Sequence, residues 1–364
     1  MSGGGTGGHI IPNLALIREL KMRYAEPGQL QLLYIGTRSG MEEMLLKEEA
    51  VEYRGITCGK LRRYFSFYNF LDLFKVPVGI VQAFFILLRF SPNAVFCKGG
   101  YVCFPVAVAA RLLGIPVVLH ESDVVPGLAN RLSARFASRI CISFEESRKF
   151  FKHEKVVFTG NPVRRELEFS NKAEGLKFLE FDDSLPVVLF MGGSLGADYI
   201  NRLVWKNLEY LLPHYQIVHI CGAGKVRDTE ELLPFLKEEH RRKISRYRAF
   251  EFIKNELKDV YAASDVIIGR AGAISLAEID FFEKPAILIP LTKGASRGDQ
   301  IVNARAFAKT HVCSILEEGT FSDMQFMEEI QHFVKHKGAA HFGHMKQKDR
   351  FFALEKIIHI LETV

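Results

Sequence analysis

The stretch Gly3-Gly4-Gly5-Thr6-Gly7-Gly8-His9 decides how the front of this 364-residue chain folds. A helical pattern follows it, from Asn13 to Tyr24. A helix start exposes unpaired N–H groups and about half a unit of positive charge, which favour an anion. Glycines have no Cβ, so the backbone can close around that anion. The stretch therefore predicts an anion-binding turn.

Two further glycine turns follow other apolar runs. Gly192–Ala197 (GGSLGA) comes directly after Val187–Met191, and Lys98–Tyr101 (KGGY) comes after Ala94–Cys97. A single glycine loop is often no more than a tight turn. Three such loops at the ends of expected strands favour ligand binding over that alternative.

The front stretch also satisfies G-x-G-x-x-G through Gly3, Gly5 and Gly8. That pattern alone is weak evidence for a dinucleotide site, which needs an acidic residue at the end of the next strand. Tyr34–Thr37 occupies that place and holds no acidic residue. Binding of a nicotinamide dinucleotide is therefore disfavoured.

Short apolar runs alternate with longer helical patterns along the chain. Runs without strict alternation, separated by helices, are typical of parallel sheets covered on both faces. Two such series predict an α/β protein with two doubly wound parallel-sheet domains. The expected strands are Gln31–Ile35, Ala94–Cys97, Val117–Leu119, Arg139–Ser143, Val156–Thr159, Val187–Met191, Gln216–Cys221, Phe250–Phe252, Asp265–Ile268, Ala286–Ile289 and Val312–Ile315.

Turn chemistry at Thr159-Gly160-Asn161-Pro162 indicates the boundary between the domains. We expect one domain over 1–163 and another over 164–345. The remaining residues, 346–364, are expected to form a C-terminal helix that packs back on the first domain, and 166–184 a polar connection.

The front domain lacks an obvious first strand. In a doubly wound domain the first glycine loop follows a central strand, but only Met1 and Ser2 precede Gly3. Either that strand lies outside this sequence or the domain does without it. A missing central strand would leave its neighbours with costly unpaired backbone groups.

Composition narrows the class of protein. Hydrophobic residues make up 48% and charged residues 25%, as in an ordinary folded protein. The net charge of +6 is too small for a tail-driven nucleic-acid binder, so no nucleic-acid partner is expected. The basic excess lies in residues 1–163, with 20 Lys and Arg against 13 Asp and Glu, which directs the search for an anionic partner there.

Two kinds of structure are not expected. The six cysteines form no C-x-x-C pair, which argues against a disulfide framework or a zinc ribbon and fits a reducing cytosol. No apolar run reaches the roughly 18–20 residues of a membrane helix, and no secretory signal is apparent.

These motifs together resemble the MurG family, the N-acetylglucosaminyltransferases of peptidoglycan synthesis. They occur in family order along nearly the whole chain, which is far more specific than any one motif. The matching segments are GGGTGGHIIP (3–12), KGGYVCFP (98–105), HESDVVPGLANR (120–131), TGNPVRREL (159–167), GGSLGA (192–197), EFI (251–253), SDVIIGRAGAISLAEI (264–279) and DQIVNA (299–304).

The resemblance implies a GT-B architecture, in which two Rossmann-like domains face a cleft. It implies an inverting transfer of N-acetylglucosamine from UDP-N-acetylglucosamine to the 4-hydroxyl of muramic acid in undecaprenyl-pyrophosphoryl-muramoyl-pentapeptide, without a cofactor or a metal. The implied partners are those two substrates, an anionic membrane surface and a complex of cell-wall synthesis. The implied location is peripheral, on the cytoplasmic face of the bacterial inner membrane.

The resemblance also implies roles for individual residues, with His9 as the candidate base and Glu278 holding the ribose. Without the motif context, His9 would be interpreted as a structural histidine and Glu278 as part of a solvated helix face. The implied donor-binding residues are Thr6, Gly7, Gly8, Arg164, Gly193, Ser194, Ile253, Ala273, Ile274, Ser275, Leu276, Ala277, Glu278, Asp299 and Gln300. The implied acceptor-side residues are Gly99, Gly100, Tyr101, His120, Glu121, Asp123 and Asn130.

Two positions depart from the family pattern. The family usually has Asn where this chain has Asp123, and a carboxylate near phosphates should be repulsive. A serine common before the Gly-Ala of the donor motif is Ala271 here.

A segment rich in aromatic and basic residues, 57–77, predicts contact with an anionic leaflet. Each basic residue would add about 1 kcal/mol to that contact. An ordinary core helix with a basic rim is the alternative. The residues expected at the membrane are Lys60, Arg62, Arg63, Tyr64, Phe65, Phe67, Phe70 and Phe74.

Three other functions stay open at this stage. A GT-B enzyme with another lipid acceptor, such as diacylglycerol, would carry similar motifs. A catalytically degenerate nucleotide-sugar-binding protein would fit the short front of the chain and Asp123. A nicotinamide-dependent oxidoreductase fits least well.

Overall fold

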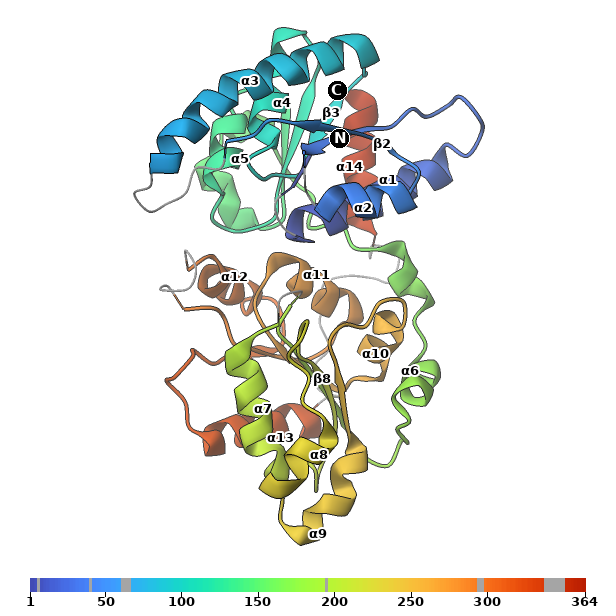
Figure 1. The fold of residues 1–364 in the computed structure, drawn as a ribbon, viewed down its shortest axis with the longest axis vertical. Coiled ribbons are helices and arrows are strands. Elements are labelled where there is room, and N and C mark those ends of the chain that lie inside the picture. Colours follow the sequence, from blue (N-terminus) through green and yellow to red (C-terminus); the bar gives the residue numbers. More distant parts are fainter. Residues whose placement is uncertain (5–6, 39–40, 60–66, 194–195, 293–297, 337–350) are drawn as a thin grey trace. The chain divides into compact units, whose positions relative to one another are not determined.

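The computed structural model describes all residues except 5–6, 39–40, 60–66, 194–195, 293–297 and 337–350 (Figure 1). The chain divides into two compact units. The first comprises Met1–Arg165 with Lys348–Val364, and the second comprises Glu166–Gln347. Both are built on parallel sheets, as the strand pattern predicted.

The sheet of the first unit has two parts, with strand orders β1-β2 and β3-β4-β5-β6, all parallel. Ser2 joins the two parts, because it forms parallel bridges to Ile35 in β1 and Cys97 in β3. The strands are β1 (Leu33–Thr37), β2 (Glu52–Ile56), β3 (Val95–Cys97), β4 (Val117–Glu121), β5 (Arg139–Ile142) and β6 (Val156–Phe158).

Met1 and Ser2 occupy the place of the central strand. The Ser2 amide donates to the Phe96 carbonyl (2.8 Å), and the Ile35 amide donates to the Met1 carbonyl (2.9 Å). The Lys98 amide donates to the Ser2 carbonyl (2.9 Å). Two residues thus supply backbone partners to both neighbouring strands, so the unpaired groups expected from the sequence do not arise at these positions.

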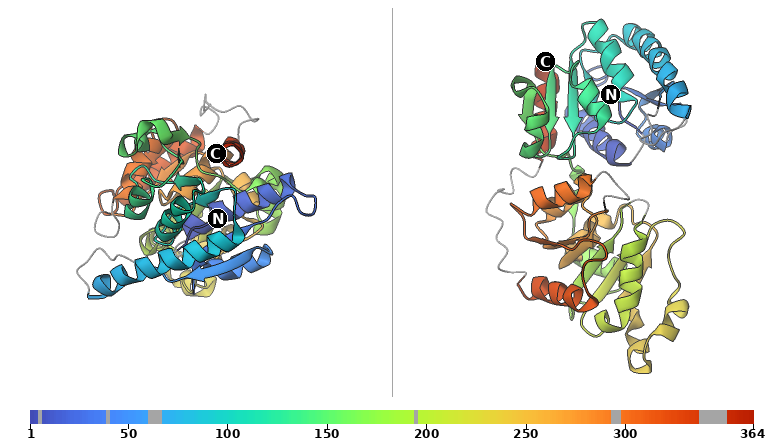
Figure 2. Two further views of the ribbon diagram at one scale, coloured as in Figure 1. Left: turned by 90° about the horizontal axis from the view of Figure 1, so that it is seen from above. Right: turned by 90° about the vertical axis from the view of Figure 1, so that its left-hand side faces the viewer.

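Helices cover both faces of the first sheet (Figures 1 and 2). Successive residues of β4 show the two layers: Val117 and Leu119 pack with α3 and α4, whereas Val118 packs with α1 and α14. This alternation follows from the period of two in a strand. The helices of this unit are α1 (Gly7–Arg23), α2 (Met41–Glu48), α3 (Phe67–Phe90), α4 (Cys103–Leu112), α5 (Leu128–Ser133) and α14 (Phe352–Thr363).

The second unit has one parallel sheet with the order β12-β11-β10-β7-β8-β9. This is the order of a doubly wound sheet, in which the chain starts at the centre and winds to each edge in turn. The strands are β7 (Val187–Met191), β8 (Gln216–Ile220), β9 (Tyr247–Phe250), β10 (Val266–Gly269), β11 (Ala286–Leu288) and β12 (Cys313–Ile315).

The core of the second unit lies between this sheet and helices α7 and α13, which pack on Phe190, Ile217 and Ile268. On the other side α10 packs on α6 and contacts β7. The helices are α6 (Lys172–Leu179), α7 (Asp198–Leu211), α8 (Thr229–Leu232), α9 (Glu238–Arg241), α10 (Leu257–Ala263), α11 (Ala273–Phe282), α12 (Asp299–Phe307) and α13 (Asp323–Lys335).

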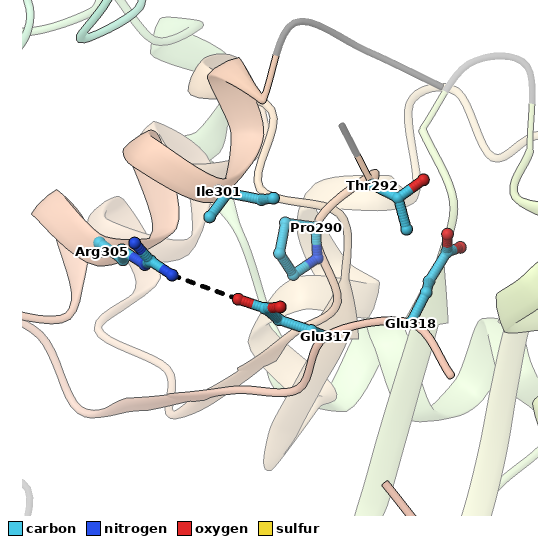
Figure 3. Close-up of a pocket in the computed structure, with 6 residues that line it drawn as sticks. All are labelled: Pro290, Thr292, Ile301, Arg305, Glu317 and Glu318. Carbon is cyan, nitrogen blue, oxygen red and sulfur yellow. Dashed lines mark hydrogen bonds and ion pairs between the residues drawn. The ribbon is translucent and has the colours of Figure 1, made fainter. Parts of the chain in front are cut away.

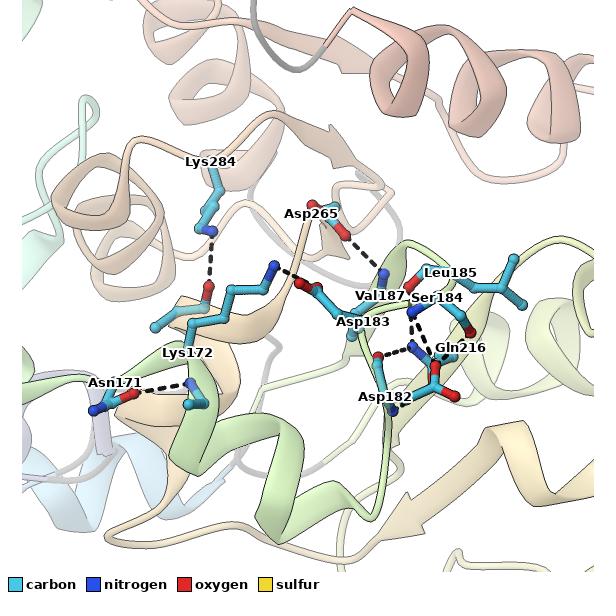
Figure 4. Close-up of polar contacts among 12 residues, drawn as sticks. Asn171, Lys172, Asp182, Asp183, Ser184, Leu185, Val187, Gln216, Asp265 and Lys284 are labelled. Atoms are coloured by element: carbon cyan, nitrogen blue, oxygen red, sulfur yellow. Dashed lines mark hydrogen bonds and ion pairs between the residues drawn. The ribbon is translucent and has the colours of Figure 1, made fainter.

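Polar contacts hold the amino ends of these strands (Figure 4). The Gln216 side chain donates to the carbonyls of Asp182 (2.8 Å) and Leu185 (2.9 Å). The Asp265 carboxylate accepts from the Val187 amide at 2.8 Å. Asn171 caps α6 by accepting from the next amides. Gln216 and Asp265 thus anchor the amino ends of β7 and β8, opposite the carboxyl ends where the glycine loop lies.

Three secondary-structure elements differ from those predicted from the sequence. β2 was not predicted, because its exposed Glu52 and Arg54 do not form the apolar run of a buried strand. β9 ends at Phe250, where the sequence predicted a strand to begin. The supposed polar connection over 166–184 contains α6.

No helix among the described residues combines the length and apolar character that spanning a bilayer requires.

Candidate active site

Each unit has one point at which the strand order reverses. In the first unit it lies at Ser2, between β1 and β3. In the second unit it lies between β7 and β10. Ligands of such sheets bind outside the carboxyl ends of the strands at this switch point. Every glycine loop singled out in the sequence starts there, at Gly3, Lys98 or Gly192.

In the first unit the two glycine loops pack closely against each other. Gly100 has φ +87°, and a Cβ there would lie 2.2 Å from the Gly4 carbonyl oxygen. Gly99 has φ +118°, and its Cβ would lie 3.1 Å from His9 Cε1 and 3.2 Å from the Asn130 side-chain amide. Only glycine fits these positions, because any side chain would push the loops apart.

His9 and Asn130 therefore converge on one point beside Gly99, although 121 positions separate them in the chain. His9 is half-buried in the first turn of α1, and Asn130 is buried at the start of α5. Helix α1 begins at Gly7, so Gly7 and Gly8 belong to its first turn rather than to the preceding loop. Thr6 lies outside the described residues.

Glu121, at the end of β4, is the centre of a buried polar network. Its carboxylate accepts from the Asp123 amide (2.9 Å), the Asn130 Nδ2 (2.8 Å) and the Gly127 amide (3.3 Å). Burial and the nearby Asp123 carboxylate raise the pKa of Glu121 to about 7.

His120 is fully buried, and its Nε2–H donates to the Gly160 carbonyl (3.0 Å). Burial, and next the Lys98 ammonium, hold the pKa of His120 well below its usual range, so the ring is neutral. Tyr101 is half-buried, and burial raises its pKa. Arg164 is half-buried after β6.

The glycine loop of the second unit, which follows β7, is equally tight. A Cβ on Gly192 would lie 2.2 Å from the Ala197 amide nitrogen. Gly196 has φ +69°, and its Cβ would lie 1.9 Å from the Cys221 carbonyl oxygen. Gly193 also has a positive φ, +82°. Ser194 lies outside the described residues, so its predicted phosphate contact has no structural description.

A chain of buried hydrogen bonds, which the sequence analysis missed, supports this loop. Asn201 in α7 donates to the Cys221 carbonyl (3.0 Å) and accepts from His219 Nε2 (3.0 Å). The other ring nitrogen of His219 accepts from the Tyr247 hydroxyl (2.9 Å), which accepts from the Trp205 indole (3.3 Å). Each donor has one acceptor, so the chain is fully ordered.

Glu278 is buried in α11, with 7% of its surface exposed. Its carboxylate accepts from the Tyr261 hydroxyl at 3.0 Å, and Tyr261 stacks on Phe282. The alternative of a solvated helix face is therefore wrong for this residue. Tyr261 is a supporting residue that the sequence analysis missed, because nothing in its own segment indicates a polar partner in α11.

The other predicted donor residues are spread over three elements. Ala273, Ile274, Ser275, Leu276 and Ala277 form the first turns of α11, directly after β10. Ile253 is almost fully buried after β9. Their backbone groups lie at the carboxyl edge of the sheet, as ligand contacts in this fold do.

Asp299 and Gln300 begin α12 after Gly298, which has φ +78°. The Gln300 side-chain oxygen accepts from the Leu291 amide at 3.0 Å. Gln300 thus ties the start of α12 to the segment that follows β11. Ala271, the departure from the donor motif, is fully buried.

A pocket of about 280 Å³ lies beside α12 (Figure 3). Arg305 forms an ion pair across it with Glu317 (3.3 Å). Its lining contains none of the predicted donor residues and consists of Pro290, Thr292, Ile301, Arg305, Glu317 and Glu318. Among the residues that the structure describes, no three His, Cys, Asp or Glu side chains gather as metal ligands do.

The predicted membrane segment is only partly described. Lys60, Arg62, Arg63, Tyr64 and Phe65 lie outside the described residues. Phe67 and Phe70 lie in the first turns of α3, where the structure describes the backbone only. Phe74 is exposed on the same helix.

Family models and relatives of known name match nearly the whole chain. Residues 1–142 match the model of the glycosyltransferase family 28 N-terminal domain, and residues 187–358 match that of its C-terminal domain. A Clostridium tetani protein named UDP-N-acetylglucosamine--N-acetylmuramyl-(pentapeptide) pyrophosphoryl-undecaprenol N-acetylglucosamine transferase is 42% identical, over 100% of this chain and 96% of its own length. A Clostridium botulinum (strain Langeland) protein of the same name is 44% identical over 93% and 91%.

Solved structures agree. The crystal structure of Acinetobacter baumannii MurG superimposes with a TM-score of 0.74 at 26% identity, covering 100% of this chain and 98% of that one. UDP-GlcNAc 2-epimerase from Neisseria meningitidis, solved with UDP-GlcNAc, has a TM-score of 0.62 at 15% identity, covering 98% and 97%. The second likeness concerns the fold alone. The expected GT-B fold with two parallel-sheet domains is confirmed.

Proposed function

Because the chain belongs to the MurG family within glycosyltransferase family 28, we propose that it converts lipid I to lipid II. It transfers N-acetylglucosamine from UDP-N-acetylglucosamine to the 4-hydroxyl of muramic acid in undecaprenyl-pyrophosphoryl-muramoyl-pentapeptide. The observation that carries this proposal is the identity of 42% to a relative of that name over the full length of the chain.

On the acceptor side, His9 accepts the proton of the attacking hydroxyl. A sugar hydroxyl is a weak nucleophile, so a positioned base contributes typically 10²–10⁴-fold. The convergence of His9 and Asn130 beside Gly99 supports this role, because Asn130 also bonds Glu121 and so joins His9 to a buried polar network. Gly100, Tyr101, His120 and Asp123 complete the acceptor side.

On the donor side, backbone amides take up the charge of the leaving UDP. Gly193, the closely packed Gly192 and Gly196, and the start of α11 lie at the switch point of the second sheet, where backbone N–H groups can meet an anion. Arg164 adds a cation to this charge stabilisation. Glu278 binds the ribose, Ile253 the uracil through its backbone, and Asp299 with Gln300 the sugar.

The direct test is transfer of labelled N-acetylglucosamine to a short-chain lipid-linked muramoyl-pentapeptide. We expect a disaccharide product of inverted, β configuration. Diacylglycerol assayed in parallel tests the rival acceptor. UDP-sugar binding without transfer or hydrolysis would identify a degenerate binding protein, and a nicotinamide titration tests the oxidoreductase alternative.

A lipid-linked acceptor requires contact with a membrane, and we infer that α3 makes it. Small or buried residues, Gly79, Ala83 and Leu87, face the core of the first unit. The opposite face carries an exposed apolar stripe at helical spacing, and Phe85 alone is 62% exposed. The stripe consists of Phe74, Val78, Val81, Phe85 and Leu88.

This stripe continues the aromatic and basic segment predicted from the sequence toward the C-terminal end of α3. An apolar face with basic flanks binds an anionic interface through buried area and charge. Replacement of Val81 and Phe85 by Ser should lower cosedimentation with phosphatidylglycerol vesicles severalfold. Unchanged binding would exclude the stripe, and unchanged transfer to a short-chain acceptor is the control for folding.

A further inference from the structure

We propose that Lys98 is a positioning residue for the acceptor: its buried ammonium neutralises the carboxylates of Glu121 and Asp123, so that their loop can face an anionic diphosphate. The inference rests on the proposed function, because it places the acceptor at this loop. Lys98 opens the KGGY turn that follows β3, and the proposed transfer chemistry gives it no role.

The first observation is the burial of a charge. Lys98 is 0% exposed, directly after β3. A buried ammonium is costly unless it is paired and hydrogen-bonded. Its Nζ donates to the hydroxyl of Ser122, which is itself buried. Ser122 stands between Glu121 and Asp123, so this bond ties the lysine to the centre of the acceptor-side loop.

The second observation is the balance of charge around this ammonium. Glu121 and Asp123 are the two strongest charges acting on Lys98, and both favour its protonated form. Burial nevertheless lowers the pKa of Lys98 to about 8, so the group stays mostly charged at neutral pH. The neighbouring His120 is neutral, so Lys98 rather than His120 supplies positive charge beside these two carboxyl groups.

The third observation is that the loop is held in one position. Ser147 donates to the Asp123 carbonyl (3.0 Å), and Asn161 donates to the Ser122 carbonyl (3.4 Å). Ser143 donates to the Glu121 carbonyl (3.0 Å). The Asp123 carboxylate therefore cannot move away with its backbone when an anion approaches.

Together these observations account for a carboxylate at Asp123 in this position. Asp123 adds one negative charge beside an anionic substrate. Lys98 adds one positive charge within the same cluster, which restores the balance. The two residues form a pair, and either change alone should be worse than both together.

A double-mutant cycle tests this pairing. Lys98→Met leaves the Asp123 carboxylate without its cation and should raise the KM for the short-chain lipid-linked acceptor at least tenfold. The KM for UDP-N-acetylglucosamine should stay within twofold. Lys98→Met with Asp123→Asn should recover the acceptor KM to within threefold of the wild type.

A merely structural lysine would give a different pattern. Lys98→Met would then lower kcat without separating the two KM values, and Asp123→Asn would not rescue it. That result overturns the proposal. Lys155→Met is the matched control, because its ammonium donates to the Ala137 carbonyl (2.7 Å) in the same unit and not to the loop of Asp123.

Denaturation of the wild type, Lys98→Met, Asp123→Asn and the double variant tests the pair independently of any substrate. We expect Lys98→Met to lower the melting temperature and the double variant to recover most of the loss. Additive effects would refute the pairing whatever the acceptor is. Absence of transfer by the wild type, with coupling in denaturation intact, would instead refute the proposed function alone.

Discussion

The two switch points of this protein share a backbone plan but differ in their chemistry. Both pack a glycine loop so closely against neighbouring backbone that a Cβ would clash, at Gly100 in the first unit and Gly196 in the second. The first unit surrounds its loops with ionisable groups: His9, Lys98 and Glu121. The second supports its loop with a neutral, fully ordered hydrogen-bond chain.

This difference fits the two tasks in a sugar transfer. The attacking hydroxyl must lose a proton, which requires a group that titrates near neutral pH. The leaving diphosphate needs donors that stay in place while charge develops, which neutral amides provide without reorganisation. Substitutions of the ionisable groups in the first unit and of the neutral hydrogen-bond chain in the second test this difference.

The largest effect is expected for His9→Ala. The variant lacks the proposed base, so turnover should fall at least 10²-fold, while the dissociation constant of UDP stays within about twofold. Steady-state kinetics and calorimetry measure the two quantities. Unchanged turnover would remove His9 from the base role and leave the first switch point without a proton acceptor on α1.

Glu278→Ala should have the next largest effect. It removes both the proposed ribose contact and the acceptor of the Tyr261 hydroxyl, so UDP-sugar binding should weaken about 10–100-fold. Tyr261→Phe is the matched control, since it removes only the internal bond and should change binding much less. Equal affinities in wild type and Glu278→Ala would contradict the ribose contact.

The neutral chain of the second unit predicts a pH dependence of its stability. Burial lowers the pKa of His219 from 6.5 to about 3. The folded state therefore stays unprotonated while the unfolded state binds a proton below pH 6.5, so stability falls as the pH falls from 6.5 toward 3. At pH 5 this costs about 2 kcal/mol relative to pH 7.5.

His219→Gln cannot take up this proton, so its unfolding free energy should lose about 2 kcal/mol less over the same range. Urea denaturation followed by fluorescence measures this, because Trp205 is the single tryptophan of the chain and lies in this hydrogen-bond chain. Identical pH dependence in both proteins would show that His219 titrates normally.

The smallest effect is expected at the pocket beside α12. Arg305 and Glu317 are largely exposed, and such ion pairs contribute little. Arg305→Ala should therefore leave UDP-sugar affinity within about twofold, measured by calorimetry. A larger loss would show that the donor site extends beyond the residues predicted from the sequence.

The sequence was most informative where a local pattern has one structural solution. Glycine turns were expected directly after two apolar runs, and the loops at Lys98 and Gly192 do follow β3 and β7, with Val187–Met191 as the strand β7. The sequence was least informative where the residues of a strand are partly exposed. Glu52 and Arg54 hid the edge strand β2, because these charged residues interrupt its apolar run. Ser2 bridges β1 and β3 although residues 1–2 form no apolar run that would predict a strand.

The sequence by itself determined the fold class, the family and the set of candidate residues, because these depend on the order and spacing of motifs along the chain. Only the tertiary structure decided which side chains meet. Lys98 and Ser122 are 24 positions apart, and Tyr261 and Glu278 are 17 apart on different helices. Burial and partners set the charge and direction of such groups, and neither quantity is encoded in a local pattern.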